Sequence, residues 1–216
     1  MTTLTGTFNP ADPSAPGHYG PSQTALVLLD FHNLVVNKNA GPKGPAALEV
    51  AIKLRTWAHS QGIQVIHGLV NTTLTPFPTS KDFERFKLII AAAKLNGNGD
   101  ESPELLKGGP GNEPTFARRV GYISAFKSPG FPEFLQKNGI KSLIIAGLAT
   151  SGVVLRTALE GSEEEYVVTV ISDACADPSE EAHDFLVSKI FPQRGYSTTA
   201  AEFQEGFAES SAGKGV

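Results

Sequence analysis

The chain has 216 residues, of which 40% are hydrophobic and 19% charged, a composition typical of one globular domain with a sizeable core. The 22 acidic and 18 basic side chains leave a formal net charge of −4, which argues against a nucleic-acid-binding surface, and no polybasic patch suits an anionic lipid surface. Since no run of about 18 apolar residues is present, no segment is expected to span a membrane.

The single cysteine, Cys175, excludes an internal disulfide and any metal site built from several cysteines. It lies in an apolar segment, where a lone thiol is typically an inert core group. The first residues, up to Gly20, show no charged start followed by an apolar run, so they do not resemble a signal peptide. We therefore expect a reducing, cytoplasmic compartment.

Strands and helices are predicted to alternate along one domain. An irregular arm rich in proline and glycine covers residues 1–21, the folded body covers 22–206, and the tail 207–216 is expected to be flexible. The predicted elements, in order, are a strand at 24–30, a helix at 46–60, a strand at 62–70, a helix at 81–95, a long loop at 96–114, a strand at 115–124, a helix at 132–137, a strand at 142–146, a helix at 153–159, a strand at 166–171, a helix at 178–191, a short strand at 195–198 and a brief helix with Phe203. Strand–helix–strand units pair their strands in parallel, so this alternation predicts a doubly wound sheet.

Several standard catalytic and cofactor motifs are missing. There is no G-x-S-x-G elbow, and the phosphate-loop spacing of Gly147 and Gly152 is followed by two valines instead of Lys and Ser/Thr, so no nucleotide is predicted. GNG at 97–99 follows no strand and is not a dinucleotide fingerprint. The five histidines show no metal-ligand spacing, and only Asp30-Phe-His32 could begin a site, so we expect neither a metal nor another cofactor.

Four segments carry a more specific signal through their order: the strand that ends in Asp30, RRVGYISAF (118–126), LIIAGLATSGVVLRTA (143–158) and VVTVISDACAD (167–177). Together they resemble the isochorismatase-like hydrolase superfamily, which includes nicotinamidases and related amidases, over residues 22–205. The resemblance implies a three-layer α/β/α fold with a six-stranded, mostly parallel, Rossmann-like sheet, which agrees with the predicted alternation.

The resemblance also implies a catalytic Asp, Lys and Cys. Asp30 matches the Asp, whereas the Lys position falls at Arg119, if one residue is inserted, or at Val120, and Arg118 competes for the same register. The Cys position is occupied by Val153, so a covalent acyl-enzyme cannot form there and thiol-dependent amide hydrolysis is disfavoured. Neither Cys175 nor Lys127 is expected to replace the missing group, the first because it lies far along the chain and the second because it is interpreted as a solvated side chain.

The same resemblance places a cis peptide bond between Leu148 and Ala149, with the N–H groups of Ala149 and Val153 aimed at a developing oxyanion. The substrate-binding candidates are Phe31, His32, Phe126, Leu148 and Thr150. Structural roles are the alternatives: core packing for the two phenylalanines, a buried hydrogen bond for His32 and a helix cap for Thr150. His67, at a predicted strand end, is interpreted as a core histidine.

True isochorismatases, which this chain resembles in lacking the Cys, protonate a vinyl ether from the Asp before water adds. That role requires Asp30 to be kept protonated by an apolar pocket, while Arg119 would favour the carboxylate or clamp a substrate carboxylate. The leading interpretation is a Cys-independent hydrolase of a small, cyclic, carboxylated substrate, with Asp30 as general acid/base. The alternatives are a non-hydrolytic enzyme that rearranges or eliminates by proton transfer, and a catalytically silent small-molecule-binding protein. The resemblance implies a homo-oligomer, a dimer or tetramer, with no nucleic-acid or membrane partner.

Overall fold

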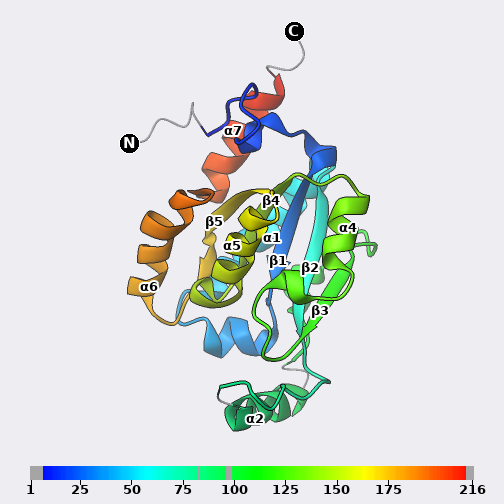
Figure 1. The fold of residues 1–216 in the computed structure, drawn as a ribbon, viewed down its shortest axis with the longest axis vertical. Helices are drawn as coiled ribbons and strands as arrows, with labels where there is room; N and C mark the ends of the chain where they lie inside the picture. Colours follow the sequence, from blue (N-terminus) through cyan, green and yellow to red (C-terminus); the bar gives the residue numbers. More distant parts are fainter. Residues whose placement is uncertain (1–6, 82, 96–98, 213–216) are drawn as a thin grey trace.

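The computed structural model describes residues 7–81, 83–95 and 99–212 and has one central β-sheet (Figure 1). Its strands are β1 (Thr24–Leu29), β2 (Gln64–Asn71), β3 (Thr115–Arg119), β4 (Ser142–Leu148), β5 (Val167–Ala176) and β6 (Tyr196–Thr198). They lie in the order β3-β2-β1-β4-β5-β6, and every neighbouring pair is parallel. The predicted six-stranded doubly wound sheet is therefore confirmed.

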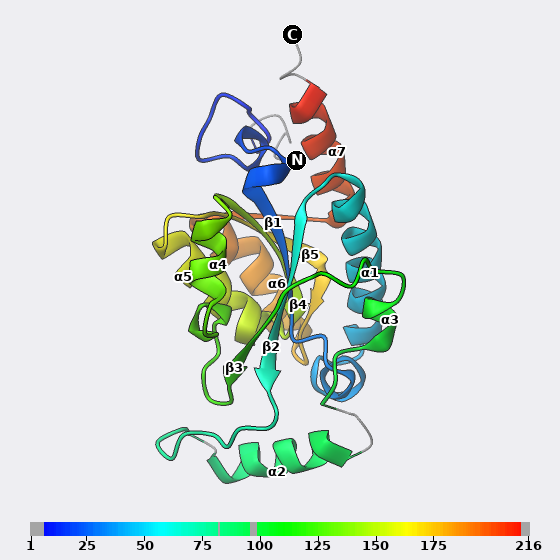
Figure 2. The ribbon, with the colours of Figure 1, turned by 90° about the vertical axis from the view of Figure 1, so that its right-hand side faces the viewer.

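Helices cover both faces of this sheet (Figure 2). They are α1 (Gly44–Ser60), α2 (Phe83–Lys94), α3 (Pro103–Leu106), α4 (Phe131–Lys137), α5 (Leu155–Glu163), α6 (Glu180–Phe185) and α7 (Ala200–Ala212), together with short 3-10 and π turns. α1, α3 and α7 lie on one side of the sheet and α4 and α5 on the other, whereas α2 stands apart, beyond the carboxyl ends of the strands. No helix in the described part of the chain is long and apolar enough to cross a membrane.

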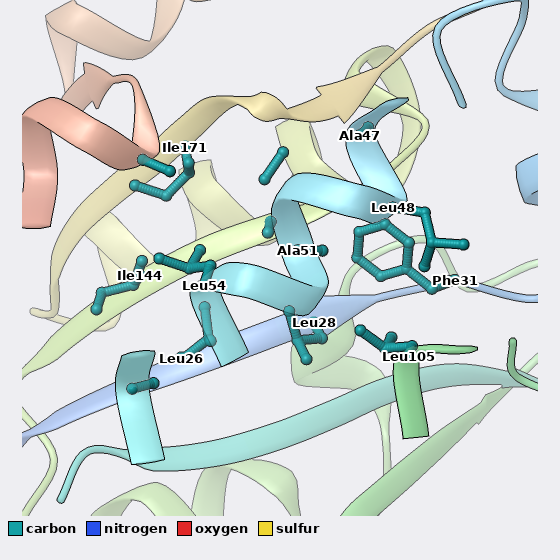
Figure 3. Close-up of a cluster of buried hydrophobic side chains, with 14 of the residues drawn as sticks. Leu26, Leu28, Phe31, Ala47, Leu48, Ala51, Leu54, Leu105, Ile144 and Ile171 are labelled. Carbon is teal, nitrogen blue, oxygen red and sulfur yellow. The ribbon is translucent and has the colours of Figure 1, made fainter. Parts of the chain in front are cut away.

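Successive side chains of β1 point to opposite faces, and both faces are buried. Leu26 and Leu28 pack with α1 residues such as Leu54 (Figure 3). Val27 and Leu29 belong to the second core cluster, under α4 and α5. A strand buried on both sides needs an unbroken apolar run, which explains why the segment has no polar alternation and why it ends where Asp30 begins.

The C-terminal helix extends further than predicted. The predicted tail at 207–216 is helical as far as Ala212, because Phe203 and Phe207 lie one turn apart and both contact Trp57, with ring centroids 5.9 and 5.6 Å away. Residues 213–216 lie outside the described residues. The N-terminal arm, described from residue 7, packs on the same helix through Phe8, whose ring centroid is 5.4 Å from that of Phe203.

Two strand lengths also differ from the prediction. β3 ends at Arg119 instead of running to residue 124, since Gly121 has a φ of +103°, which a continuing strand cannot accommodate. β5 continues to Ala176, past a register shift opposite Gly147. The predicted loop at 96–114 contains α3, and its first three residues, 96–98, lie outside the described residues and include most of the GNG segment.

Candidate active site

Asp30 follows β1 at the carboxyl edge of the sheet. Its φ is +54°, in the left-handed region, and its backbone N–H donates to the carbonyl of Gly68 on β2 at 2.9 Å. Asp tolerates this conformation better than most residues, and backbone positions of this kind concentrate at functional sites. The side chain is 9% exposed, so the carboxyl group lies at the bottom of the site, shielded from bulk water.

Arg118, on β3, binds both carboxylate oxygens of Asp30. Its Nη1 donates to Oδ1 at 3.0 Å, its Nη2 donates to Oδ2, and its Nε donates to the carbonyl of Tyr122 at 3.1 Å. The arginine side chain is 2% exposed. A bidentate, buried pair of this kind is among the stronger side-chain contacts, and it occupies both carboxylate oxygens of Asp30.

The neighbouring Arg119, the candidate from the sequence, points elsewhere. Its Nε donates to the carbonyl of Thr75 at 2.7 Å and its Nη2 to that of Pro76 at 3.1 Å, in the segment between β2 and α2. Adjacent strand residues face opposite sides of a sheet, so when Arg118 faces Asp30, Arg119 cannot. The structure therefore gives the position beside Asp30 to Arg118, which the sequence left as the competing register.

Both ring nitrogens of His32 form hydrogen bonds with backbone groups. Its Nε2 accepts the N–H of Val70 at 3.2 Å, so Nδ1 carries the proton and donates to the carbonyl of Gly99 at 2.7 Å. Nε2 lies 3.9 Å from Oδ1 of Asp30 and has no proton to offer it. The neutral histidine thus lines the site and attaches the segment that follows residue 98 to the end of β1.

The segment 149–153, here called the nucleophile loop, connects β4 to α5. It begins after a cis peptide bond between Leu148 and Ala149, as the resemblance implies. Asp177 accepts the N–H of Ser151 at 2.7 Å, and Thr150 shares a 2.8 Å hydrogen bond with His183. The loop is therefore held from the side of β5 and α6, which leaves its other side facing the space above Asp30.

That space is a cavity of about 600 Å³ between the sheet edge, the nucleophile loop and α2. Asp30, Arg118 and His32 lie at its inner end, and Leu148, Ala149 and Val153 form one wall. The outer wall comes from α2 and the segment before it, and its apolar members include Phe77, Phe86, Ile89, Ile90 and Ala93. Its volume lies within the range of about 300–1,000 Å³ that holds small organic ligands.

Three of the predicted substrate-binding residues lie outside the residues that line this cavity. Phe31 is fully buried in the core cluster under α1, beside Leu48 and Leu105 (Figure 3). Phe126 packs on Phe131 in the opposite cluster, with ring centroids 5.3 Å apart. The Thr150 side chain is fully buried and shares its hydrogen bond with His183 of α6. The core-packing alternative therefore holds for the two phenylalanines, whereas Thr150 contacts a neighbouring helix instead of capping its own.

Sequence reasoning missed a buried polar network behind the site, formed by Arg55, His59, His67, Glu101 and Glu113. Glu113 accepts hydrogen bonds from Arg55 and His59, and His67 donates through Nδ1 to Glu101 at 2.6 Å. Burial alone would raise the pKa of Glu113, but the hydrogen bonds from Arg55 and His59 and the charges around it outweigh burial and lower the pKa to about 2. Arg55 and His59 lie one turn apart on α1, but the other three members come from distant parts of the chain, so no local spacing signals the network.

No group of three or more His, Cys, Asp or Glu side chains within residues 7–81, 83–95 and 99–212 is arranged to hold a metal ion. The thiol of Cys175 is fully buried on β5, and burial raises its pKa to about 12. Lys127 pairs on the surface with Glu160 of α5. Neither side chain contributes to the cavity wall.

A model of the isochorismatase domain matches residues 24–202, which is most of the chain and includes both Asp30 and the nucleophile loop. The chain belongs to the isochorismatase family. A probable inactive nicotinamidase from Arabidopsis thaliana is 29% identical over 168 residues, covering 74% of this chain and 84% of its own. A probable hydrolase from Escherichia coli strain K12 is 31% identical over 104 residues, covering 48% of this chain and 49% of its own.

The fold of this isochorismatase family member is also that of solved structures. An isochorismatase family protein from Burkholderia thailandensis superposes with a TM-score of 0.72 at 22% identity, covering 87% of this chain and 96% of the other. The family machinery implied by the resemblance is altered here in two places. Arg118 lies beside Asp30, and residue 153 is Val in place of the Cys that the resemblance implies.

Proposed function

We propose that this isochorismatase family protein is a Cys-independent hydrolase of a small carboxylated substrate, with Asp30 as its general acid/base. The observation that carries the proposal is that Asp30 is the one carboxylate among the described residues that line the cavity. Val153, on the nucleophile loop, offers no nucleophile, so the chemistry must proceed through proton transfer and water.

Vinyl-ether hydrolysis is the reaction that best suits this set of groups. Asp30 delivers a proton to the terminal carbon of the vinyl ether, water adds to the oxocarbenium ion, and the hemiketal collapses to a ketone and an alcohol while a proton returns to Asp30. Arg118 binds both oxygens of Asp30, so at least one of these hydrogen bonds must be released before Asp30 can donate a proton to the substrate. The apolar walls of the cavity exclude water and so favour the uncharged acid once substrate is bound.

Silent binding is the second candidate, and a specific feature favours it. Both oxygens of Asp30 are already bound by Arg118, and Val153 stands where the family carries its Cys. The relative from Arabidopsis thaliana is itself named a probable inactive nicotinamidase. A cavity that retains its shape without catalytic chemistry would act as a binding site for a small organic acid.

Pyruvate release from isochorismate tests the proposal directly. Wild type should release pyruvate, Asp30→Asn should not, and Asp184→Asn, which changes an exposed Asp on α6, should behave as wild type. No release by wild type would remove vinyl-ether hydrolysis of this substrate and, if the substrate still binds, favour silent binding. Conversion to an isomer without pyruvate would instead favour rearrangement or elimination by proton transfer.

A further inference from the structure

Among the described residues that line the cavity, positive and negative charges are not balanced. Asp30 and Arg118 neutralise one another at its inner end, and His32 is neutral because Nε2 accepts a backbone hydrogen bond. Lys81 also lines the cavity, and among the described residues no hydrogen bond or ion pair engages its side chain. Counted over the described residues that line it, the cavity thus carries one positive charge in excess, although the whole chain has a formal net charge of −4.

The two arginines near the site are not available to bind a substrate carboxylate. Arg118 uses three of its N–H groups on Asp30 and Tyr122 and is 2% exposed. Arg119 is occupied by the carbonyls of Thr75 and Pro76 and does not line the cavity among the described residues. A substrate carboxylate would have to compete with the buried Asp30 carboxylate for Arg118, whereas Lys81 has no competing carboxylate among the described residues.

Lys81 is held in a defined place although its side chain is exposed. The N–H of Ser80 donates to the carbonyl of Phe77 at 2.9 Å, and the N–H of Phe83 donates to the carbonyl of Ser80 at 3.2 Å, so a hydrogen-bonded turn carries it to the start of α2. The ring of Phe77 lies against Tyr122, with centroids 5.3 Å apart. Thr79 and Ser80 line the cavity beside Lys81 and add hydroxyl donors to its ammonium group.

We infer that Lys81 is a specificity-determining residue, which binds the carboxylate of the substrate at the open end of the cavity while the reacting bond lies at Asp30. The substrate is then an amphipathic carboxylic acid with an apolar body, since Phe77, Phe86 and Ile89 line the space between the two ends. Its size is that of a ligand for a cavity of about 600 Å³. This inference rests on the proposed function, which supplies the carboxylated substrate.

Binding of 2-naphthoate and its uncharged carboxamide, measured by calorimetry, tests the inference without turnover. Wild type should bind the acid about 1.5- to fivefold more tightly than the amide, the range typical of an exposed ion pair, and added salt should reduce this preference. Lys81→Met should abolish the preference by weakening the acid alone, and Lys81→Arg should restore it. Lys87→Met is the matched control, because Lys87 lies on α2, pairs with Glu84 and is not among the residues that line the cavity.

Equal binding of acid and amide by wild type, a preference that survives in Lys81→Met, or no binding of either compound would overturn the inference. The turnover measurement separates this outcome from failure of the proposed function. A Lys81-dependent preference without pyruvate release would retain the inference and reject isochorismate hydrolysis. If Asp30→Asn abolished pyruvate release but Lys81→Met released pyruvate with the KM of wild type, isochorismate hydrolysis would be retained and the role of Lys81 rejected.

Discussion

Arg118 donates to both carboxylate oxygens of Asp30 inside the protein, where the two side chains are 2% and 9% exposed. The two residues are 88 positions apart in sequence and belong to β3 and the end of β1. The pair joins an edge strand to the centre of the sheet, so it contributes to stability as well as to the chemistry of the site. Each role can be tested separately.

Arg118→Met should lower the free energy of unfolding by about 3–5 kcal/mol, because it leaves the Asp30 charge buried without a partner. Arg119→Met removes hydrogen bonds to two loop carbonyls and should cost about 1 kcal/mol or less. Urea unfolding of the two variants beside wild type measures both values. Equal losses would show that the buried pair contributes no more than the surface contact.

Val153→Cys should create a thiol that reacts in the native protein, because residue 153 lines the cavity. The swap is close to volume-conserving and should cost less than about 1.5 kcal/mol. Mass spectrometry after iodoacetamide treatment should find one adduct on the native variant and none on native wild type, whose Cys175 is fully buried with its pKa raised to about 12. Wild type in urea, where Cys175 becomes accessible, is the positive control. Rapid alkylation of native wild type would contradict the prediction.

His67 should stabilise the fold most at low pH. Burial alone would lower its pKa, but hydrogen bonds and charges from Glu101 and Glu113 outweigh burial and raise the pKa above 6.5. A raised folded pKa gives stability that is fully present below the unfolded pKa and is lost as pH rises through the folded value. The destabilisation caused by His67→Gln, measured by urea unfolding, should therefore shrink as pH rises above neutrality.

His183 provides a control, because its pKa shift has the opposite sign to that of His67. Burial lowers its pKa, and the folded protein therefore binds fewer protons at this group than the unfolded chain. Its neutral form is favoured, so wild type loses stability relative to His183→Gln as pH falls below about 6.5. If the two histidine variants showed the same pH trend, the assigned environments would be incorrect.

Gly147→Ala should destabilise the sheet edge beside the site. A Cβ at this position would lie 2.6 Å from the Cβ of Leu29 and 2.7 Å from its carbonyl oxygen, so β1 and β4 would have to separate. We expect a loss of about 1–3 kcal/mol in the free energy of unfolding. Gly20→Ala is the control, since nothing lies within 4 Å of the added Cβ, and it should change stability by less than about 0.5 kcal/mol. A loss of the same size in both variants would count against close packing at Gly147.

The strands of this protein could be predicted because a strand buried on both faces needs a continuous run of apolar residues, which is visible in the sequence. The runs at 24–29 and 142–148 are fully buried and, after the polar residues Thr24 and Ser142 that begin them, contain no polar side chain, and each is followed by residues of the site. The position of Asp30 and of the nucleophile loop then follows from the rule that ligands bind beyond the carboxyl ends of parallel strands. The helical end at Ala212 was not predicted, because its stability comes from contacts with Trp57 in a distant helix.

The alternation of strands and helices, the Asp that follows β1 and the absence of a thiol at residue 153 could all be recognised in the amino-acid sequence. The choice between Arg118 and Arg119 needed the three-dimensional structure, because the two arginines differ in which face of β3 they occupy, and that depends on the pairing of β3 with β2. The polar network around His67 and the cavity wall that α2 forms with Lys81 also became visible only in the folded protein. These groups meet through long-range packing, and no local periodicity encodes a contact between elements that are far apart in the chain.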